Sequence, residues 1–226
     1  MKIPLFDNDG TLLIGGSANR VHHKAFDEAL HTVYGLADAS VAEITISGKV
    51  DSQIILEVAL LHGFPEEEAL ALLPQAFTVM SQYFSEHKHE GMPQAEKGAK
   101  ELLQLLQGKT HIGVLTGNIE SIGWEKLTQA GLREFIEFGS FGNLALRRVA
   151  LINIAQHRYE QQFKEKRPLT DFVSIGDTPR DIASAREGGI QVIAVATGHY
   201  TKEELKEADL VVETLEEQQE ILNFLS

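Results

Sequence analysis

Two aspartates lie one residue apart in the stretch FDNDGTLL, directly after the first short apolar run of the chain. Asp7 and Asp9 would stand at the end of a buried strand. Paired carboxylates are electrostatically costly there unless a cation or a reaction accounts for them. The alternative is a turn in which an aspartate hydrogen-bonds to its own backbone. The stretch by itself does not decide between a site and a turn.

Two more polar clusters follow apolar runs later in the chain. The segment LTGN supplies Thr116, Gly117 and Asn118, and the segment IGDTPRD supplies Asp177 and Asp181. Each segment could by itself be the start of a helix. At successive strand ends, however, the three clusters favour one shared site, because ligands of open α/β sheets bind beyond the carboxyl ends of the strands.

The residue types predict phosphoryl transfer. Asp7, Asp9 and Asp177 make a dense negative site that a hard divalent cation such as Mg²⁺ would neutralise. An aspartate could then attack phosphorus and form an acyl phosphate, while a second carboxylate protonates the leaving oxygen and later activates water. Thr116, backbone amides and an arginine would hold the phosphoryl oxygens. The arginine would come from the pair RR at positions 147 and 148.

The rest of the sequence falls into two regions with different patterns of apolar residues. From about residue 92 onward, short β-rich runs alternate with amphipathic segments, and the runs cover 111–115, 136–139, 171–176, 191–196 and 210–213. This alternation predicts an α/β fold with a Rossmann-like parallel sheet covered on both faces. The opening IPLF adds a strand. Because Pro4 has no amide hydrogen, we expect the pairing of that strand to begin at about Leu5.

Residues 15–88 carry apolar side chains at helical spacing and predict an all-helical insert. Asp51 is placed to cap one of its helices. Pro74 should kink or break another. We therefore expect a core domain made of residues 1–14 and 89–226, with a helical cap domain formed by residues 15–88.

Composition excludes several classes of partner. The chain has 226 residues with 20 basic and 33 acidic side chains, and its net charge of −13 would repel nucleic acid and anionic membranes. No segment approaches the roughly 20 apolar residues of a membrane span, and the first apolar run is too short for a signal peptide. There is no cysteine, which fits a reducing compartment. We expect a soluble, cytoplasmic monomer or homodimer that acts on a small phosphorylated metabolite.

The motifs resemble those of the haloacid dehalogenase-like (HAD) hydrolase superfamily. FDNDGTLL resembles motif I, VLTGN resembles motif II and SIGDTPRDIASAREGG resembles motif IV. The stretch GLREFIEFGSFGNLALRRVALINIAQHR is similar to members with an arginine some six residues after FG, which implies Arg148 as the motif III cation and Arg147 as the fallback. The resemblance covers nearly the whole chain. It implies the phosphatase branch with an α-helical cap between motifs I and II, similar to phosphoglycolate phosphatases.

Carried over by position, the resemblance implies that Asp7 is the nucleophile and Asp9 the general acid and base. Asp7, the main-chain carbonyl of Asp9 and Asp177 would bind Mg²⁺. Asp181 would stand behind them or hold a metal-bound water. Asn8 replaces a commonly apolar residue between the two aspartates, and strand alternation should turn its side chain away from the site.

The same resemblance implies a phosphate-binding set. Thr116 and Arg148 would hold the phosphoryl group, and Gly117 and Asn118 would contribute amides or orient the loop. Arg148 replaces the usual motif III lysine, which keeps the charge and offers a bidentate fork. In the insert, Lys49 of ISGKVDSQ would contact the distal part of the substrate or would be a solvated surface lysine.

These implications favour a Mg²⁺-dependent phosphatase that hydrolyses a small phosphate monoester through a phosphoaspartate, with phosphoglycolate-like metabolites as the family default. Within the family, the aspartate at position 9 argues against dehalogenation and phosphonate cleavage. A phosphomutase of the sugar-phosphate type shares all the clusters and stays open, as does a catalytically silent binding protein with the same fold. We interpret the histidines, including His22 and His23, as ordinary residues of the predicted helices.

Overall fold

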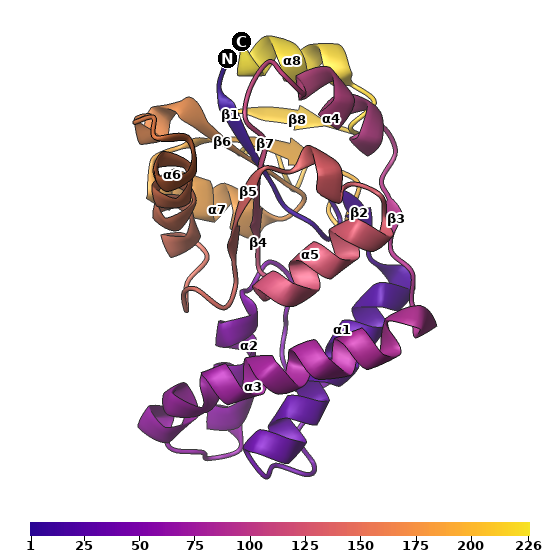
Figure 1. The fold of residues 1–226 in the computed structure, drawn as a ribbon, viewed down its shortest axis with the longest axis vertical. Coiled ribbons are helices and arrows are strands. Elements are labelled where there is room, and N and C mark those ends of the chain that lie inside the picture. Colours follow the sequence, from indigo (N-terminus) through magenta and orange to yellow (C-terminus); the bar gives the residue numbers. More distant parts are fainter.

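The computed structural model describes all 226 residues, which form a sheet-containing body above a helical body (Figure 1). The sheet has six strands in the order β5-β4-β1-β6-β7-β8, and every pairing is parallel. The strands are β1 (Ile3–Phe6), β4 (Gly113–Thr116), β5 (Phe138–Phe141), β6 (Phe172–Gly176), β7 (Gln191–Val195) and β8 (Leu210–Val212). The predicted α/β Rossmann-like fold is confirmed.

Helices cover both faces of the sheet because its strands are buried on both sides. Side chains of β1 alternate between two apolar cores: Phe6 belongs to one and Leu5 to the other. The first core is closed by helices α4 (Ala99–Leu106), α5 (Glu120–Gln129) and α8 (Gln218–Leu225). The second core is closed by α6 (Ala150–Phe163) and α7 (Pro179–Gly188).

Pro4 takes part in pairing, so the expectation that β1 pairs only from about Leu5 is wrong for one of its neighbours. Toward β6 the register begins at Ile3, whereas toward β4 it begins at Leu5. The amide of Asp7 donates to Ile175 of β6. Because strand amides alternate in direction, residue 4 faces β4, where no pairing has begun. The missing donor of Pro4 therefore costs no ladder hydrogen bond.

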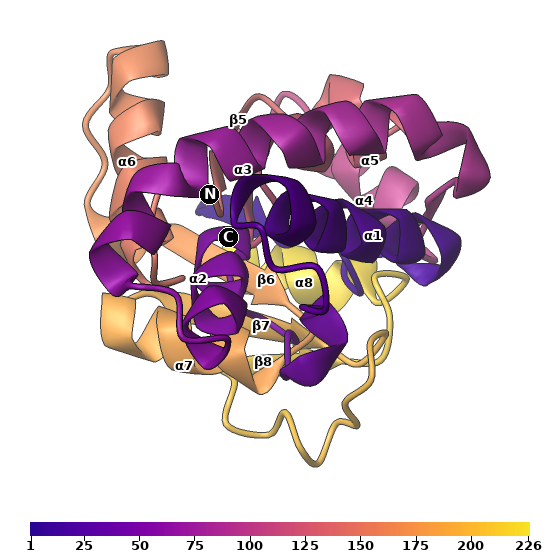
Figure 2. The same cartoon turned by 90° about the horizontal axis from the view of Figure 1, so that it is seen from below.

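The helical body consists of α1 (Gly16–Val33), α2 (Asp51–Leu61) and α3 (Glu66–His87), with the short 3-10 helices Val41–Glu43 and Lys88–Glu90. Helices α1 and α3 lie side by side (Figures 1 and 2). Pro74 does not break α3, because Leu73 and Ala76 on either side of it are packed in the helical body's own apolar core. Asp51 does not cap α2 either. Val50 holds the N-cap position, and the Asp51 side chain turns toward the sheet body.

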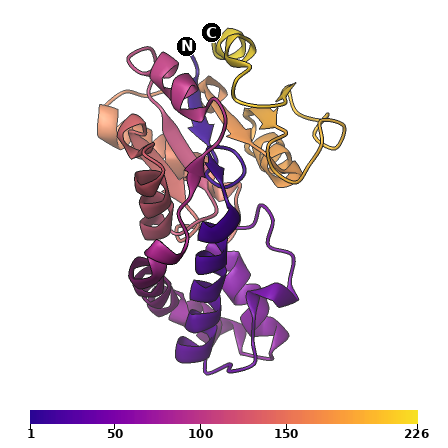
Figure 3. The ribbon, with the colours of Figure 1, turned by 90° about the vertical axis from the view of Figure 1, so that its right-hand side faces the viewer.

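Two linkers join the bodies next to each other. Strands β2 (Leu13–Ile14) and β3 (Gln94–Ala95) pair antiparallel, so the outgoing and returning segments form one short ribbon. Figure 3 shows this ribbon between the sheet and the helices below it. None of the helices combines the length and the apolar character needed to span a bilayer.

Candidate active site

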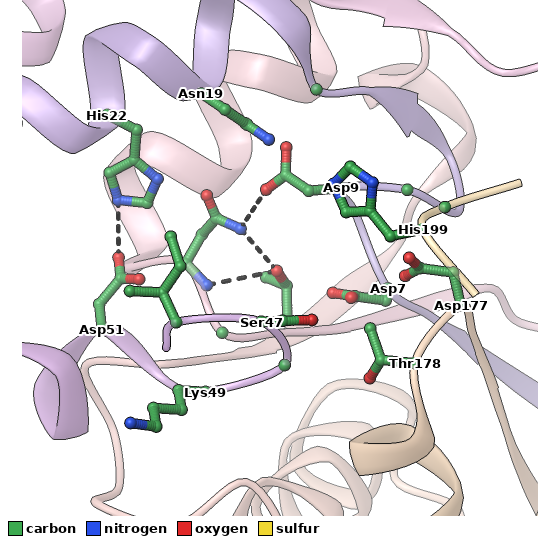
Figure 4. Close-up of a pocket in the computed structure, with 18 of the residues that line it drawn as sticks. Asp7, Asp9, Asn19, His22, Ser47, Lys49, Asp51, Asp177, Thr178 and His199 are labelled. Atoms are coloured by element: carbon green, nitrogen blue, oxygen red, sulfur yellow. Dashed lines mark hydrogen bonds and ion pairs between the residues drawn. The ribbon is translucent and has the colours of Figure 1, made fainter. Parts of the chain in front are cut away.

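A cavity of about 510 Å³ lies between the carboxyl ends of the strands and the helical body. Asp7 follows β1, Thr116 ends β4 and Asp177 follows β6, and all three line this cavity. From the helical body, His22 and Lys49 line the opposite wall (Figure 4). The strand ends that the sequence singles out therefore converge at one edge of the sheet, as parallel topology requires.

Three buried carboxylates cluster at the cavity, and Asp7 and Asp177 line it. Asp7, Asp177 and Asp181 each place a carboxylate oxygen within 4.8 Å of the others. Arg148 is the cation that touches this cluster: its Nη2 lies 3.1 Å from Asp7 Oδ2 and it also pairs with Asp181. One guanidinium thus faces three carboxylates, which leaves a local excess of negative charge.

Burial in the first place, and this excess of charge in the second, raise the pKa values of two of the acids. Burial, reinforced by Asp181 and Asp7, raises the pKa of Asp177 to about 8. Burial raises the pKa of Asp7 to about 6, although Arg148 opposes the rise. Oxygen ligands held close together in this way suit a hard divalent cation, and such an ion would remove the cost of ionising both groups. The cluster therefore fits Mg²⁺ by its chemistry.

The backbone leaves little room around Asp177. Gly10 and Gly198 approach so closely that a Cβ atom on either one would overlap the Asp177 carboxylate. Gly10 has a φ of +85°, a conformation that side chains strain. Thr197, next to Gly198, donates a hydrogen bond of 2.6 Å to the Gly10 carbonyl. These loops hold Asp177 in a tight cradle.

Asp181 supports the cluster from the first turn of α7. One of its oxygens accepts hydrogen bonds from the Thr178 hydroxyl at 2.6 Å and from the Thr178 amide at 3.0 Å, completing a capping box. The other oxygen pairs with Arg148. Both oxygens are therefore occupied, and the carboxylate fixes the position of the arginine.

Asp9 points away from the other aspartates. Its carboxylate accepts hydrogen bonds from Asn118 Nδ2 at 2.8 Å and from Lys126 Nζ at 3.0 and 2.8 Å. Burial alone would raise the pKa of Asp9, but Lys126 and Asn118 outweigh it and lower the pKa below its ordinary value. Asp7 and Asp9 thus occupy different electrostatic environments although only Asn8 separates them. Asn8 is fully buried and donates to the Gly123 carbonyl.

The loop after β4 joins the two bodies. Asn118 donates to the Thr116 hydroxyl at 2.9 Å. The Gly117 carbonyl accepts a hydrogen bond of 2.8 Å from the amide of Asp51, the first residue of α2. A Cβ atom on Gly117 would overlap the Lys49 carbonyl oxygen. The helical body is therefore seated directly on the loop that follows Thr116.

The two arginines of the RR pair lie in different surroundings. The Arg148 side chain is 8% exposed and reaches the carboxylate cluster. The Arg147 side chain is 70% exposed and pairs with Glu187 on the surface. Of the two candidates, the structure thus brings Arg148 to the site and leaves Arg147 outside it.

Lys49 is not a solvated surface lysine. Its side chain is 6% exposed, and its Nζ lies 2.5 Å from Glu57 of α2. Figure 4 shows the side chain directed away from Asp7. Lys49 lines the cavity, but its charge is already paired.

Four residues of the cavity region were missed by sequence reasoning. His22 is buried, and its Nε2 lies 3.0 Å from Asp51. Lys126 occupies a position on α5 that helical spacing from Ile122 assigns to the apolar face, and a lysine there is a usable signal. Thr197 and His199 line the cavity from the loop after β7, and the polar TGH that follows that predicted strand was the available signal.

Comparisons with known proteins agree with this fold. Residues 147–218 match the model of the HAD-hydrolase-like family, and no curated protein matches the chain. A hydrolase from Pseudomonas syringae superposes with a TM-score of 0.70 at 19% identity over 100% of both chains. A predicted phosphatase from Clostridium acetobutylicum gives 0.66 at 22% identity over 98% of both chains. A β-phosphoglucomutase from Clostridium difficile gives 0.68 at 16% identity over 99% of this chain and 98% of that one.

These structural likenesses establish the fold, and the family match covers the part of the sequence that carries Arg148, Asp177 and Asp181. The order of the motifs, the parallel sheet and the segment that the family model matches are consistent with one another. Residues 147–218 thus resemble the HAD-hydrolase-like family, and the whole chain shares the fold of these solved structures.

Proposed function

We propose that this protein is a Mg²⁺-dependent phosphatase that hydrolyses a small phosphate monoester through a phosphoaspartate on Asp7. The observation that carries the proposal is the separation of two neighbouring carboxylates. Asp7 lies in an acidic cluster with Arg148, whereas Asp9 is held apart by Lys126 and Asn118. Pairs of acids in contrasting environments suit different roles in one reaction.

The metal would be held by Asp7, the main-chain carbonyl of Asp9 and Asp177, with Asp181 behind them. When bound, Mg²⁺ supplies positive charge that lets an anionic carboxylate approach an anionic phosphate. Thr116 and Arg148 would hold the phosphoryl oxygens. Both are buried at the floor of the cavity.

The protein residues would act in two steps. First, an Asp7 carboxylate oxygen bonds to phosphorus while the bond from phosphorus to the ester oxygen breaks. Because Lys126 and Asn118 lower its pKa, Asp9 would first take up a proton from solvent and then give it to the departing alcohol. Second, Asp9 takes a proton from a water molecule whose oxygen attacks phosphorus. The acyl phosphate bond then breaks, and inorganic phosphate and the Asp7 carboxylate are released.

We propose that residues 15–88 act as a cap over this reaction. Three observations support the role: the helical body has an apolar core of its own, its loop at Lys49 is seated on Gly117, and both linkers run through the β2–β3 ribbon. A closed cap would exclude bulk water while Asp7 is phosphorylated, and opening would release the products.

A phosphomutase is the second candidate. The solved structures with this fold include a β-phosphoglucomutase, and the seated helical loop would also serve an enzyme that must exclude water. In that case a sugar hydroxyl, not water, would attack the phosphoaspartate. Interconversion of hexose 1-phosphate and 6-phosphate without net phosphate release would identify this activity.

The test of the proposed function is release of inorganic phosphate from p-nitrophenyl phosphate and a panel of phosphorylated metabolites, with Mg²⁺ or with EDTA. We expect metal-dependent release that Asp7→Asn abolishes. Asp38→Asn removes an exposed aspartate of the helical body and should leave the rate unchanged. No release from any compound by folded, Mg²⁺-binding protein would reject the phosphatase and leave the mutase or a catalytically silent binding protein.

A further inference from the structure

Lys126 of α5 is fully buried, with an exposed fraction of 0%. Its ammonium group is surrounded by acceptors. Nζ lies 2.8 Å from Asp9 Oδ2, 3.0 Å from Asn19 Oδ1, 2.8 Å from Asn118 Oδ1 and 3.3 Å from His22 Nδ1. Asp9 is the carboxylate in this set, so the buried positive charge is neutralised by Asp9.

Stability alone does not account for a lysine at this position. Taking an ammonium out of water is costly, and an apolar side chain of similar volume often replaces a buried ion pair without loss of stability. The same face of α5 carries Ile122, which packs in the apolar core of the helical body. A methionine would continue that face, so the charge is better explained by what it does to Asp9.

The ammonium also joins the two bodies. Asp9 and Asn118 belong to the sheet body, whereas Asn19 and His22 belong to α1 of the helical body. An ammonium can only donate hydrogen bonds, so Nδ1 of His22 accepts and its Nε2 carries the proton. That Nε2 donates to Asp51 Oδ2 at 3.0 Å.

The path then returns to α5. The same Asp51 oxygen accepts a hydrogen bond of 2.7 Å from the Ile119 amide, which precedes the first turn of α5. A continuous chain of polar contacts therefore runs from Asp9 through Lys126, His22 and Asp51 to the start of the helix that carries Lys126. Displacement of the helical body would remove the hydrogen bonds from Lys126 to Asn19 and His22.

We propose that Lys126 is a positioning residue that fixes the orientation of the Asp9 carboxylate and couples this orientation to the seating of the helical body. The inference rests on the proposed function for the role of Asp9. The ammonium contacts both oxygens of Asp9, and Asn118 holds one of them. Rotation of the carboxylate is thereby restricted while α1 is in place.

The test compares substrates that differ in their need for a proton donor. An alkyl ester such as glycerol phosphate needs Asp9 to protonate the leaving oxygen, whereas p-nitrophenyl phosphate has a leaving group that departs without it. The ratio kcat/KM reports the steps up to formation of the phosphoaspartate. Lys126→Met should lower kcat/KM for glycerol phosphate about 100-fold and that for p-nitrophenyl phosphate by less than about threefold.

Lys88→Met is the matched control. Lys88 pairs with Glu125 of α5 at 2.8 Å on the surface and so also links the two bodies, but it does not touch Asp9. The ratio of the two substrates should stay at the wild-type value in this variant. Lys126→Gln keeps a hydrogen-bond donor in the buried position and serves if the methionine variant does not fold. We expect Lys126→Gln to change the ratio of kcat/KM for the two substrates in the same direction as Lys126→Met.

Hydrogen exchange of the full chain supplies a readout that does not depend on activity. Both Lys126 variants should exchange faster than wild type in the first turns of α1, around Asn19 and His22, and Lys88→Met should not. An unchanged substrate ratio in folded Lys126 variants, or unchanged exchange in α1, would overturn the proposal. If wild type releases no phosphate, the proposed function fails separately, and exchange in α1 alone decides whether Lys126 couples the bodies.

Discussion

Arg148 Nη2 lies 3.1 Å from Asp7 Oδ2 and the same guanidinium pairs with Asp181, whereas Arg147, the preceding residue, is directed to the surface. Although burial works against its charge, Asp181 and Asp7 hold the pKa of Arg148 above its ordinary value. The guanidinium therefore stays charged beside the carboxylates at the cavity. Under the proposed function it would balance the carboxylates before a phosphate arrives and would contact the phosphate afterwards.

Replacing Arg148 should affect both stability and activity. Arg148→Met leaves the acidic cluster without its cation. Removal of one partner of a buried pair costs about 3–5 kcal/mol of unfolding free energy, and loss of a transition-state contact lowers kcat/KM about 100- to 1,000-fold. Arg147→Met should change the unfolding free energy by less than about 0.5 kcal/mol. Urea unfolding in EDTA and phosphate release measure the two effects, and equal losses in both variants would contradict the assignment.

The metal-free protein should lose stability as the pH rises. Asp177 has an ordinary pKa of 3.8 but titrates near 8 when folded, so between these values the folded state holds a proton that the unfolded chain has released. Each rise in pH then favours unfolding. Asp7 acts in the same direction up to about pH 6. Above the folded pKa values this contribution to stability is gone.

Urea unfolding in EDTA over this pH range measures the loss. Asp177→Asn should flatten the decline, whereas Asp38→Asn should keep the wild-type profile. Mg²⁺ should restore stability at about pH 8 in wild type but much less in Asp177→Asn, because the bound ion favours the ionised carboxylate. A wild-type profile that rises between about pH 4 and pH 8 in EDTA, with no difference for Asp177→Asn, would contradict the cluster's electrostatics.

The sequence was sufficient to predict the parallel sheet and the polar residues at the carboxyl ends of its strands. Parallel topology brings strand ends together wherever an apolar run is followed by a polar cluster, so Asp7, Thr116 and Asp177 could be placed in one site. Lys126 could not be placed in this way, because its partner Asp9 lies 117 positions away in the chain. The charge of Lys126 on an apolar helical face was visible in the sequence. Its acceptors, however, come from the loops after β1 and β4 and from α1, and the sequence does not show that these segments meet.

The helices of the helical body could be predicted from the sequence, but their contacts with other elements could not. Spacing of apolar residues indicates which face of a helix is buried, and it does not say against which element. Asp51 is an example. Its residue type and position predicted a cap for α2, yet its side chain accepts a hydrogen bond from the Ile119 amide just before α5 and contacts His22. The energy of a contact between two bodies depends on how they are docked, which local pattern does not encode.

Substitution of Gly117 should prevent the helical body from seating. A methyl group there would overlap the Lys49 carbonyl oxygen and would displace the loop that donates the Asp51 amide to Gly117. We expect Gly117→Ala to lower kcat/KM about 100-fold or more, since misplacement by about 1 Å has this effect on positioned groups, while the sheet body stays folded. Asp38→Ala, at an exposed position of the helical body, is the control, and equal activity of both variants would contradict the prediction.

The charges around the cavity predict a substrate preference that one substitution should change. Lys49 and Arg148 are the lysine and arginine that line the cavity, and both are paired with acidic side chains. A substrate carboxylate would therefore find no unpaired basic side chain of this kind. We expect wild type to prefer glycerol phosphate over phosphoglycolate.

Glu57→Gln should release Lys49 and shift that preference. One charge-assisted hydrogen bond to the substrate carboxylate would raise the ratio of kcat/KM for phosphoglycolate over glycerol phosphate about tenfold. The double variant Lys49→Met/Glu57→Gln separates this effect from a general change in the cavity, because it removes the freed ammonium and should return the ratio to the wild-type value. A ratio that stays constant across all three proteins would show that Lys49 does not reach the substrate, and its buried pair with Glu57 would then serve only to hold the loop before α2.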